Sequence, residues 1–267
     1  MTIDVVAQRL GCSPSKISRI ETGHTSATTA DVSDMLAFYG VNPDIAEGLV
    51  GIARDARQRG WGHPYSTVLN STYVGFEAEA RSIRTYEQQV IPGLLQTEDY
   101  ALALIGSARW DDTDQRIAQR VRVRMQRQSL LIQDDPIDLR VVLDEAVVSR
   151  PVGGDAVMRE QFLHLLEATR LPNVTLQILP FAVGAHAAMD GAFAILDFPS
   201  DGDPDLVFAE NAAGGLFLEK DDELRTYREV FDTIRAAALD PEASSEMIKV
   251  LVEEPLWKSR RRASESI

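Results

Sequence analysis

The sequence GCSPSKISRIETG at residues 11–23 has the pattern of a tight turn followed by a short helix. Its first glycine can take the left-handed backbone conformation of a sharp turn at little steric cost. Ser13 can then cap the helix, and Pro14 suits its first position because no N–H group is needed there. Ile17 and Ile20 lie three residues apart and form one apolar face. The stretch therefore predicts a turn and the second helix of a helical pair.

The preceding residues predict the first helix of this pair. Val6, Ala7 and Leu10 fall on one helical face, and Thr2 is placed to cap the helix start. The outward face of the second helix then carries hydroxyl and cationic side chains, which suit phosphates and base edges in a DNA major groove. The predicted DNA-binding residues are Ser13, Ser15, Lys16, Ser18, Arg19, Thr22 and, from the following loop, Thr25. The alternative is an ordinary helical hairpin with a solvated outer face.

Length and composition indicate a globular chain without membrane segments. The 267 residues suffice for two modest domains, and 45% hydrophobic with 25% charged residues is ordinary for a soluble protein. The sequence shows no apolar run of membrane-spanning length and no secretory signal pattern. Cys12 is the only cysteine, which excludes an intramolecular disulfide and a cysteine-based zinc site. These features predict a cytoplasmic protein without a metal or cofactor.

The charge is distributed unevenly along the chain. The net charge is −14, yet residues 1–60 hold six basic and seven acidic side chains, so −13 falls on the remainder. A nearly neutral DNA-binding segment makes few phosphate contacts and binds weakly as a monomer. Two copies that bind adjacent half-sites add their contacts, so we expect a homodimer.

A Gly-, Pro- and Ser-rich segment, GWGHPYSTVLNS, starts at Gly60 and predicts a domain boundary. The expected organisation is a helical DNA-binding domain at 1–64, a partner-binding and dimerisation domain at 65–250, and a basic tail at 251–267.

The pattern of the second domain predicts an α+β fold with a small mixed sheet. Alternating or β-branched runs predict strands, and helices are expected at 155–170, at 219–239 and from Pro241 onward. Phe76, Ala80 and Ile83 share one helical stripe. Residues 112–132 predict an amphipathic helix whose arginines pair with acidic surface, in preference to a second DNA contact. The predicted strands are 138–145, 173–181, 191–198, 205–211 and 215–219.

The sequence does not favour an enzyme. Asp144, Glu145, His186, Asp190 and Glu210 could in principle perform acid–base chemistry or hold a metal. Their spacing matches no metal-ligand pattern, and no nucleophile elbow or phosphate-binding loop is present. Asp144 and Glu145 follow a strand directly, so we expect them to cap the next helix, although they can also line a binding surface.

AQRLGCSPSKISRIETG at residues 7–23 resembles the repressor-and-Cro-like helix-turn-helix family, also called the xenobiotic-response-element type. Residues 28–38 and Asn42–Asp44 are similar to its fourth helix and the start of its fifth. That family has a first helix of roughly a dozen residues ahead of the pair. Here Met1 stands where the last apolar residue before the second helix would lie. We therefore expect the first helix to be missing, through a start codon assigned too late or a truncation. Val6, Leu10 and Ile20 would then lose part of their cover, leaving a frayed, weakened domain.

Three runs of the remaining chain resemble the domain that follows this helix-turn-helix in the WhiJ-like, antitoxin-like regulators of actinobacteria. They are RTYEQQVIPGLLQTEDYA at 84–101, LDEAVVSRPVGG at 143–154 and LPNVTLQILPFAVGAHAAMDGAFAILDFP at 171–199. The resemblance implies a transcriptional regulator whose DNA affinity is set by an effector or a small acidic partner protein of the BldB kind. The candidate partner-binding residues are Tyr86, Gln96, Asp144, Glu145 and His186.

Two other interpretations stay open. The chain could be a protein-interaction module with a vestigial DNA-binding segment. It could also be a sensor of a small molecule, in which the PGLLQ turn at 92–96 and the GAHAAMDG loop at 184–191 frame a pocket.

Overall fold

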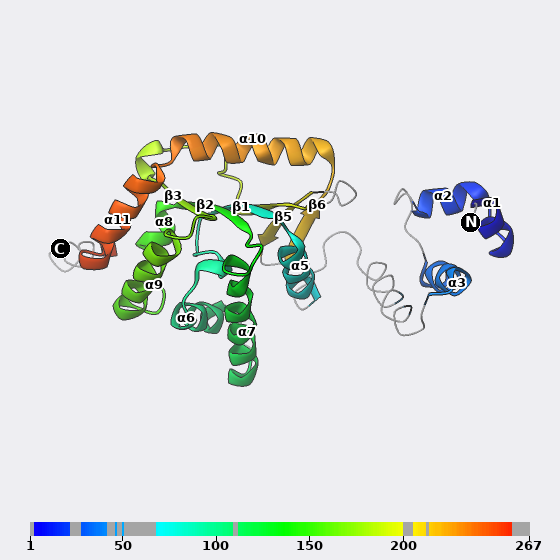
Figure 1. Ribbon diagram of the computed structural model, residues 1–267, viewed down its shortest axis with the longest axis horizontal. Helices are drawn as coiled ribbons and strands as arrows, with labels where there is room; N and C mark the ends of the chain where they lie inside the picture. Colours follow the sequence, from blue (N-terminus) through cyan, green and yellow to red (C-terminus); the bar gives the residue numbers. More distant parts are fainter. Residues whose placement is uncertain are drawn as a thin grey trace, which may run out of the picture. The chain divides into compact units, whose positions relative to one another are not determined.

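The computed structural model describes residues 3–21, 28–41, 46, 50, 68–108, 112–199, 205–211 and 214–257. Two compact units divide the chain, Met1–Pro64 and Tyr65–Ile267. Figure 1 shows their elements in sequence colours. Among the described residues, no helix is long and apolar enough to span a membrane.

The N-terminal unit is helical in its described part, with α1 (Ile3–Arg9), α2 (Pro14–Glu21) and α3 (Thr29–Tyr39). Gly11 has a positive φ of 64°, and the next backbone N–H, that of Cys12, donates to the Ala7 carbonyl at 3.0 Å. This closes the tight turn that the sequence predicts. Its buried core consists of Val6, Ala7, Ile17 and Met35.

The expected loss of cover does not occur at Val6. Val6 is buried with Ile17 and Met35, because α2 and α3 both pack against its side of α1. Leu10 and Ile20 are half-buried at the margin of the same cluster. The expected fraying of this unit stays a prediction, and Asn42–Asp44 lie outside the described residues.

The C-terminal unit contains a six-stranded mixed sheet, which with its helices confirms the predicted mixture of α and β structure. The strand order is β3-β2-β1-β4-β5-β6. Strands β1, β2 and β3 are parallel, while β4, β5 and β6 continue the sheet in antiparallel pairs. The strands are β1 (Ser82–Glu87), β2 (Asp138–Asp144), β3 (Val174–Leu179), β4 (Phe193–Asp197), β5 (Leu206–Asn211) and β6 (Gly214–Leu218).

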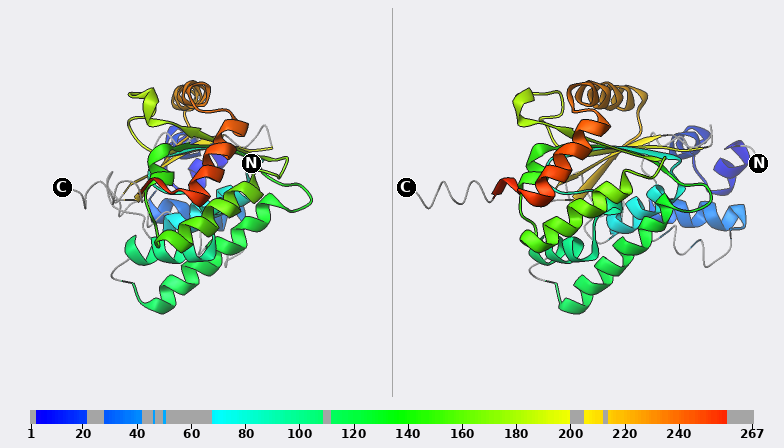
Figure 2. Two further views of the ribbon diagram at one scale, coloured as in Figure 1. Left: turned by 90° about the vertical axis from the view of Figure 1, so that its left-hand side faces the viewer. Right: turned by 60° about the vertical axis from the view of Figure 1, so that its left-hand side comes forward.

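Helices cover both faces of this sheet, as Figures 1 and 2 show. Helix α10 lies across one face; α5, α6, α7 and α9 lie on the opposite side, and α11 runs beside β3. The helices are α5 (Val68–Glu79), α6 (Glu98–Ala108), α7 (Asp114–Arg127), α8 (Glu145–Ser149), α9 (Asp155–Ala168), α10 (Asp221–Ala237) and α11 (Pro241–Glu253). Short 3-10 turns are η1 (Gly93–Leu95), η2 (Gln128–Leu131) and η3 (Phe181–Val183).

Alternation along β2 divides the apolar side chains between two cores. Val141 and its neighbours two residues away face the cluster that contains Phe162 of α9. Val142 faces the opposite cluster, in which Phe231 and Ile234 of α10 are buried. The sheet is therefore apolar on both faces, as a sheet between two helical layers must be.

The predicted helical stripe through Phe76, Ala80 and Ile83 is wrong at its C-terminal end. Helix α5 ends at Glu79, and Ile83 lies in the central strand β1, which the sequence interpretation missed. The position of Ile83 fits both the 3.6-residue repeat of a helix and the two-residue repeat of a strand, so the pattern alone did not separate a helix from a short strand. β1 pairs with β2 on one side and β4 on the other, and these partners decide its conformation.

Helix α7 is only partly the solvated helix that the sequence suggests. Arg116 and Arg120 pair with Asp112 near the helix start. Arg127, by contrast, forms two hydrogen bonds with the buried Glu77 of α5, at 2.5 and 2.7 Å. Arg124 donates to the side-chain oxygen of Gln96 at 3.0 Å. The last turn of α7 therefore joins the polar interior between α5 and η1.

Candidate functional site

Helix α2 buries one face in the core of the N-terminal unit. Ile17 is buried against α1 and α3, which fixes the rotation of the helix. The Oγ atom of Ser13 accepts the backbone N–H of Lys16 at 3.3 Å, the predicted cap. Ser13 is exposed at the start of the helix, so the same residue stabilises α2 and remains accessible.

Lys16 connects α2 to the start of α3. Its ammonium donates to Asp31 at 2.6 Å. Asp31 also accepts the Thr28 backbone N–H at 3.0 Å, while the Thr28 hydroxyl accepts the Asp31 N–H at 2.9 Å, which completes a capping box. The hydrogen bond from Lys16 is the largest cause that lowers the pKa of Asp31 to about 2. Lys16 remains 40% exposed, so its ammonium can still reach a phosphate.

The other predicted DNA-binding residues are less fully placed. Ser18 is half-buried in α2. Ser15 and Arg19 lie within α2 by their backbones, but their side chains are outside the described part of the structure. Thr22 and Thr25 fall outside the described residues. The sequence interpretation missed Asp31, and the capping-box pattern Thr28 to Asp31 was the signal that could have identified it.

In the C-terminal unit, three of the predicted partner-binding residues come together at the carboxyl ends of the parallel strands. Tyr86 is near the end of β1, Asp144 ends β2, and His186 lies on the connection that follows β3. The Tyr86 hydroxyl donates to Asp144 Oδ2 at 3.3 Å and lies 3.4 Å from His186 Nε2. The His186 Nε2–Asp144 Oδ2 distance is 3.8 Å. The carboxyl ends of the strands in a parallel sheet are where ligands bind in many α/β folds.

Hydrogen bonds fix the orientation of each member of this cluster. The Ala188 backbone N–H donates to His186 Nδ1 at 3.2 Å, so a neutral ring carries its proton on Nε2, toward Tyr86. Asp144 Oδ1 accepts the Ala146 N–H at 2.8 Å, which caps α8 as the sequence predicts. Burial, with the nearby Asp144 carboxylate, raises the pKa of Tyr86. Tyr86 therefore stays a neutral donor.

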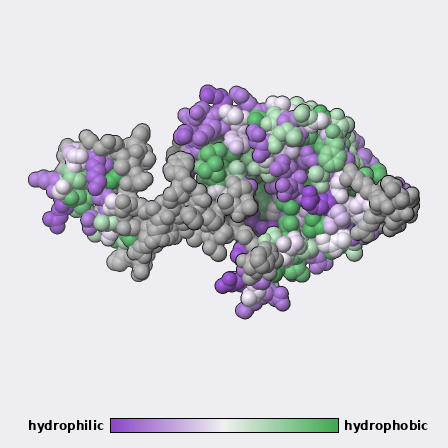
Figure 3. Space-filling view, turned by 180° about the vertical axis from the view of Figure 1, so that it is seen from behind, coloured by the Kyte–Doolittle hydropathy of each residue, from purple (hydrophilic) through white to green (hydrophobic). Residues whose placement is uncertain are grey.

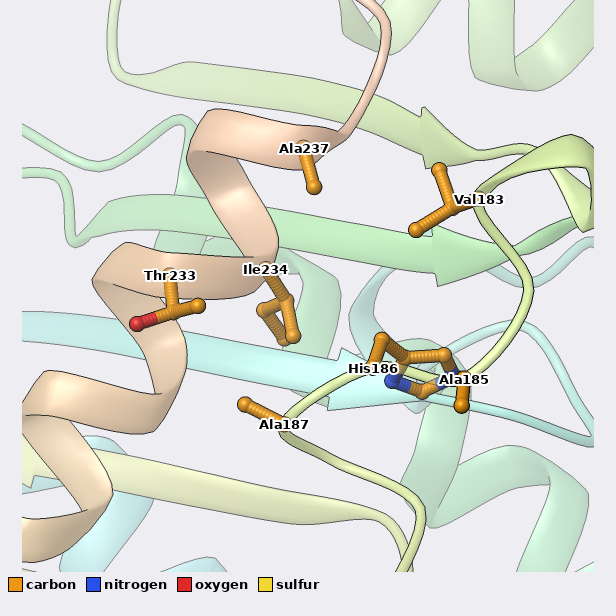
Figure 4. Close-up of a pocket in the computed structure, with 7 residues that line it drawn as sticks. All are labelled: Val183, Ala185, His186, Ala187, Thr233, Ile234 and Ala237. Atoms are coloured by element: carbon orange, nitrogen blue, oxygen red, sulfur yellow. The ribbon is translucent and has the colours of Figure 1, made fainter.

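A shallow hollow of about 400 Å³ adjoins this cluster. Figure 4 shows that one wall is the loop after β3 and the other the last turns of α10. His186 belongs to both the polar cluster and the hollow, whose other walls are apolar or small. The lining residues are Val183, Ala185, His186, Ala187, Thr233, Ile234 and Ala237. The contribution of α10 was not foreseen, since nothing in the sequence links residues 233–237 to the loop.

The two remaining predicted residues make hydrogen bonds within the domain, and partner binding by the half-exposed Glu145 stays a prediction. Glu145 Oε2 accepts the Phe181 backbone N–H at 2.8 Å and holds the start of η3. Gln96 is 1% exposed, and its amide donates to the Ile91 carbonyl at 2.6 Å while its side-chain oxygen accepts Arg124. The prediction that Gln96 meets a partner is therefore corrected: its side chain is used inside the domain. The PGLLQ turn likewise does not line the hollow.

The described residues contain no group of three His, Cys, Asp or Glu side chains placed to hold a metal ion. Residues 70–250 match a family described as a domain of unknown function (DUF5753). Residues 1–47 match a family described as a helix-turn-helix domain. No curated protein and no solved structure matches the chain.

Proposed function

The chain belongs to the DUF5753 family and carries a helix-turn-helix domain that makes it a DNA-binding regulator, and we propose that it is of the repressor-and-Cro-like type and binds operator DNA through α2. The observation that carries the proposal is the orientation of α2. Ile17 holds one face of this helix in the core, while Ser13 and Lys16 stand at its accessible start. N-terminal residues of such a helix contact base edges and phosphates in a major groove.

The ion pair between Lys16 and Asp31 is compatible with this role. An ammonium group has three donors, and Asp31 occupies one, which leaves two for phosphate oxygens. Asp31 offsets part of the positive charge, however, so each subunit contributes a modest electrostatic attraction. This agrees with the nearly neutral charge of residues 1–60 and supports binding as a homodimer to two half-sites.

We further propose that the C-terminal unit binds an effector or small partner protein that controls DNA affinity. The support for a small effector is the mainly apolar hollow that His186 lines. Tyr86, which is 1% exposed, and Asp144 lie behind His186 and hold its ring in place. An effector that binds the DNA-free protein more tightly than the DNA-bound protein lowers the affinity for DNA. The ratio of its two affinities sets the largest possible decrease. Tyr86→Phe removes the hydroxyl that orients the His186 ring, so it should weaken the thermal shift produced by an effector through His186. Tyr227→Phe, at a half-buried tyrosine of α10, should preserve that shift.

The direct test of DNA binding is fluorescence anisotropy with the DNA upstream of the protein's own gene, over a range of salt concentrations. We expect wild-type affinity to fall steeply with salt. Lys16→Ala with Arg19→Ala should lower the affinity at least tenfold and reduce the salt slope by about one for each cation that contacts a phosphate. The matched control removes two exposed cations of the C-terminal unit, Arg170→Ala with Lys249→Ala, and should leave binding unchanged.

A second variant separates charge from folding. Asp31→Asn removes the negative partner of Lys16 but keeps the Lys16 cation, so it should bind DNA as tightly as the wild type or more tightly. Equal loss of affinity in Asp31→Asn and in the double alanine variant would mean that the ion pair matters only for folding, and the proposed DNA contact would be wrong.

A protein-interaction module with a vestigial DNA-binding segment is the second candidate. The outer face of α7 favours it, because Arg122 and the 72% exposed Arg116 make this helix basic within an acidic domain. A small acidic protein of the BldB kind would fit such a surface by charge. Arg116→Glu with Arg122→Glu should then abolish its binding in calorimetry, while the double alanine variant of α2 should leave biological activity intact.

A further inference from the structure

The two edges of the sheet differ in their protection. At the β3 edge, Ile178 is occupied on its outer side: its carbonyl accepts the Leu239 N–H and its N–H donates to the Ser244 hydroxyl, both at 2.9 Å. The start of α11 thus covers this edge. At the other end, β6 pairs with β5 alone among the strands of the described residues. Its outer row of backbone N–H and C=O groups can pair with another strand.

The sequence of β6, GGLFL, lacks the features that usually protect an edge strand. It contains no charged residue and no proline, and Leu216 at its centre is 49% exposed. On the face shown in Figure 3, hydrophobic surface lies next to the hydrophilic start of α10, at the end of the sheet where β6 is the last strand.

Side chains of β6 also pack on both faces of the strand. Phe217 stacks with Phe208 of β5 and meets Phe76 of α5, with ring centroids 4.9 and 5.3 Å apart. Leu218 packs into the cluster beneath α10. A strand fixed in this way pairs with little loss of conformational entropy.

We propose that β6 is the homodimer interface, and that it pairs antiparallel with β6 of a second copy about a two-fold axis near Leu216. An antiparallel pair of identical strands is self-complementary, so a second copy satisfies the edge completely and closes the assembly. The residues after 60 carry a net charge of −13, so two copies of the C-terminal unit repel each other over most of their surface. Residues 214–218 carry no charge and avoid this repulsion. The consequence for DNA rests on the proposed function, since two half-sites require two linked subunits.

The test compares two leucines of equal exposure in the full-length protein. Leu216→Lys places two ammonium groups opposite each other at the two-fold axis, and Leu102→Lys makes the same change on α6, where Leu102 is 48% exposed. In sedimentation velocity we expect a wild-type dimer, a dimer dissociation constant raised at least tenfold in Leu216→Lys, and no change in Leu102→Lys. A bis-maleimide should cross-link copies of Leu216→Cys and not of Leu102→Cys, both compared with the wild type, which retains Cys12.

A monomeric wild type, or a dimer that Leu216→Lys leaves intact, would overturn the proposal. So would a chain that stays monomeric and uses β6 to bind a strand of a different protein. The double alanine variant of α2 keeps the two proposals distinguishable. It should lose DNA and remain a dimer, whereas Leu216→Lys should lose the dimer first and DNA affinity as a result. A wild-type dimer that ignores DNA but dissociates in Leu216→Lys would refute only the proposed function.

Discussion

Replacement of Arg127 by methionine should lower the free energy of unfolding of the C-terminal unit more than the loss of an exposed charged side chain does. Arg127 forms a bidentate pair with Glu77, at 2.5 and 2.7 Å, and its guanidinium lies 5.7 Å from the centre of the Tyr73 ring. Glu77 is only 2% exposed, so Arg127→Met keeps the apolar stem and leaves a carboxylate buried without its partner. Breaking one side of such a pair costs about 3–5 kcal/mol.

The assay is urea unfolding followed by far-UV circular dichroism. Arg170→Met is the control, because Arg170 and Glu167 form an exposed pair within α9 and its continuation, and its loss should cost less than about 0.5 kcal/mol. Glu77→Met combined with Arg127→Met should recover much of the stability, since neither member of this pair is then left buried without the other.

Two outcomes would refute this reasoning. If Arg127→Met lowered the free energy of unfolding by less than about 1 kcal/mol, Glu77 would be compensated by other groups or by water. If the double variant lost as much as the two single variants together, the residues would act independently, and the measured costs would reflect packing and not the ion pair.

Two further predictions concern Glu87 and Gly11. Burial, aided by the charge of Glu210, raises the pKa of Glu87 to about 8. The folded state therefore binds more protons than the unfolded state between the usual carboxyl pKa and about pH 8, so stability should fall as the pH rises through this window. Glu87→Gln should remove that slope and be more stable than the wild type at pH 8 by a few kcal/mol at most, with little difference near pH 4, as measured by urea unfolding at each pH. Equal pH slopes would contradict the raised pKa. In Gly11→Ala the added Cβ atom has no other atom within 4 Å, so the cost of the substitution comes from the positive φ at this position. The expected cost is about 1–2 kcal/mol in the N-terminal unit, visible as faster hydrogen exchange in residues 3–21, and unchanged exchange would mean that the turn relaxes to another conformation.

Local chemistry was sufficient to predict the helical pair at the N-terminus. The cap at Ser13, the proline after it, the turn glycine and the spacing of Ile17 and Ile20 all act within a few residues, and each is an interaction of a segment with itself. The same holds for the C-terminal strands, whose β-branched runs matched the observed β2, β3 and β4, and for the cap that Asp144 places on α8. The mixture of α and β structure followed from these segments without any knowledge of their packing.

Only the tertiary structure decided what lies between distant segments. Ile83 became part of a strand because β2 and β4 supplied hydrogen-bond partners from 50 or more positions away in the chain. Lys16 forms its ion pair with a residue of another helix. Gln96 hydrogen-bonds Arg124 inside the domain, whereas Tyr86, Asp144 and His186 cluster at the carboxyl ends of the parallel strands. A sequence pattern records which face of its own segment a residue occupies. The element that meets that face is set by chain topology, which local periodicity does not contain.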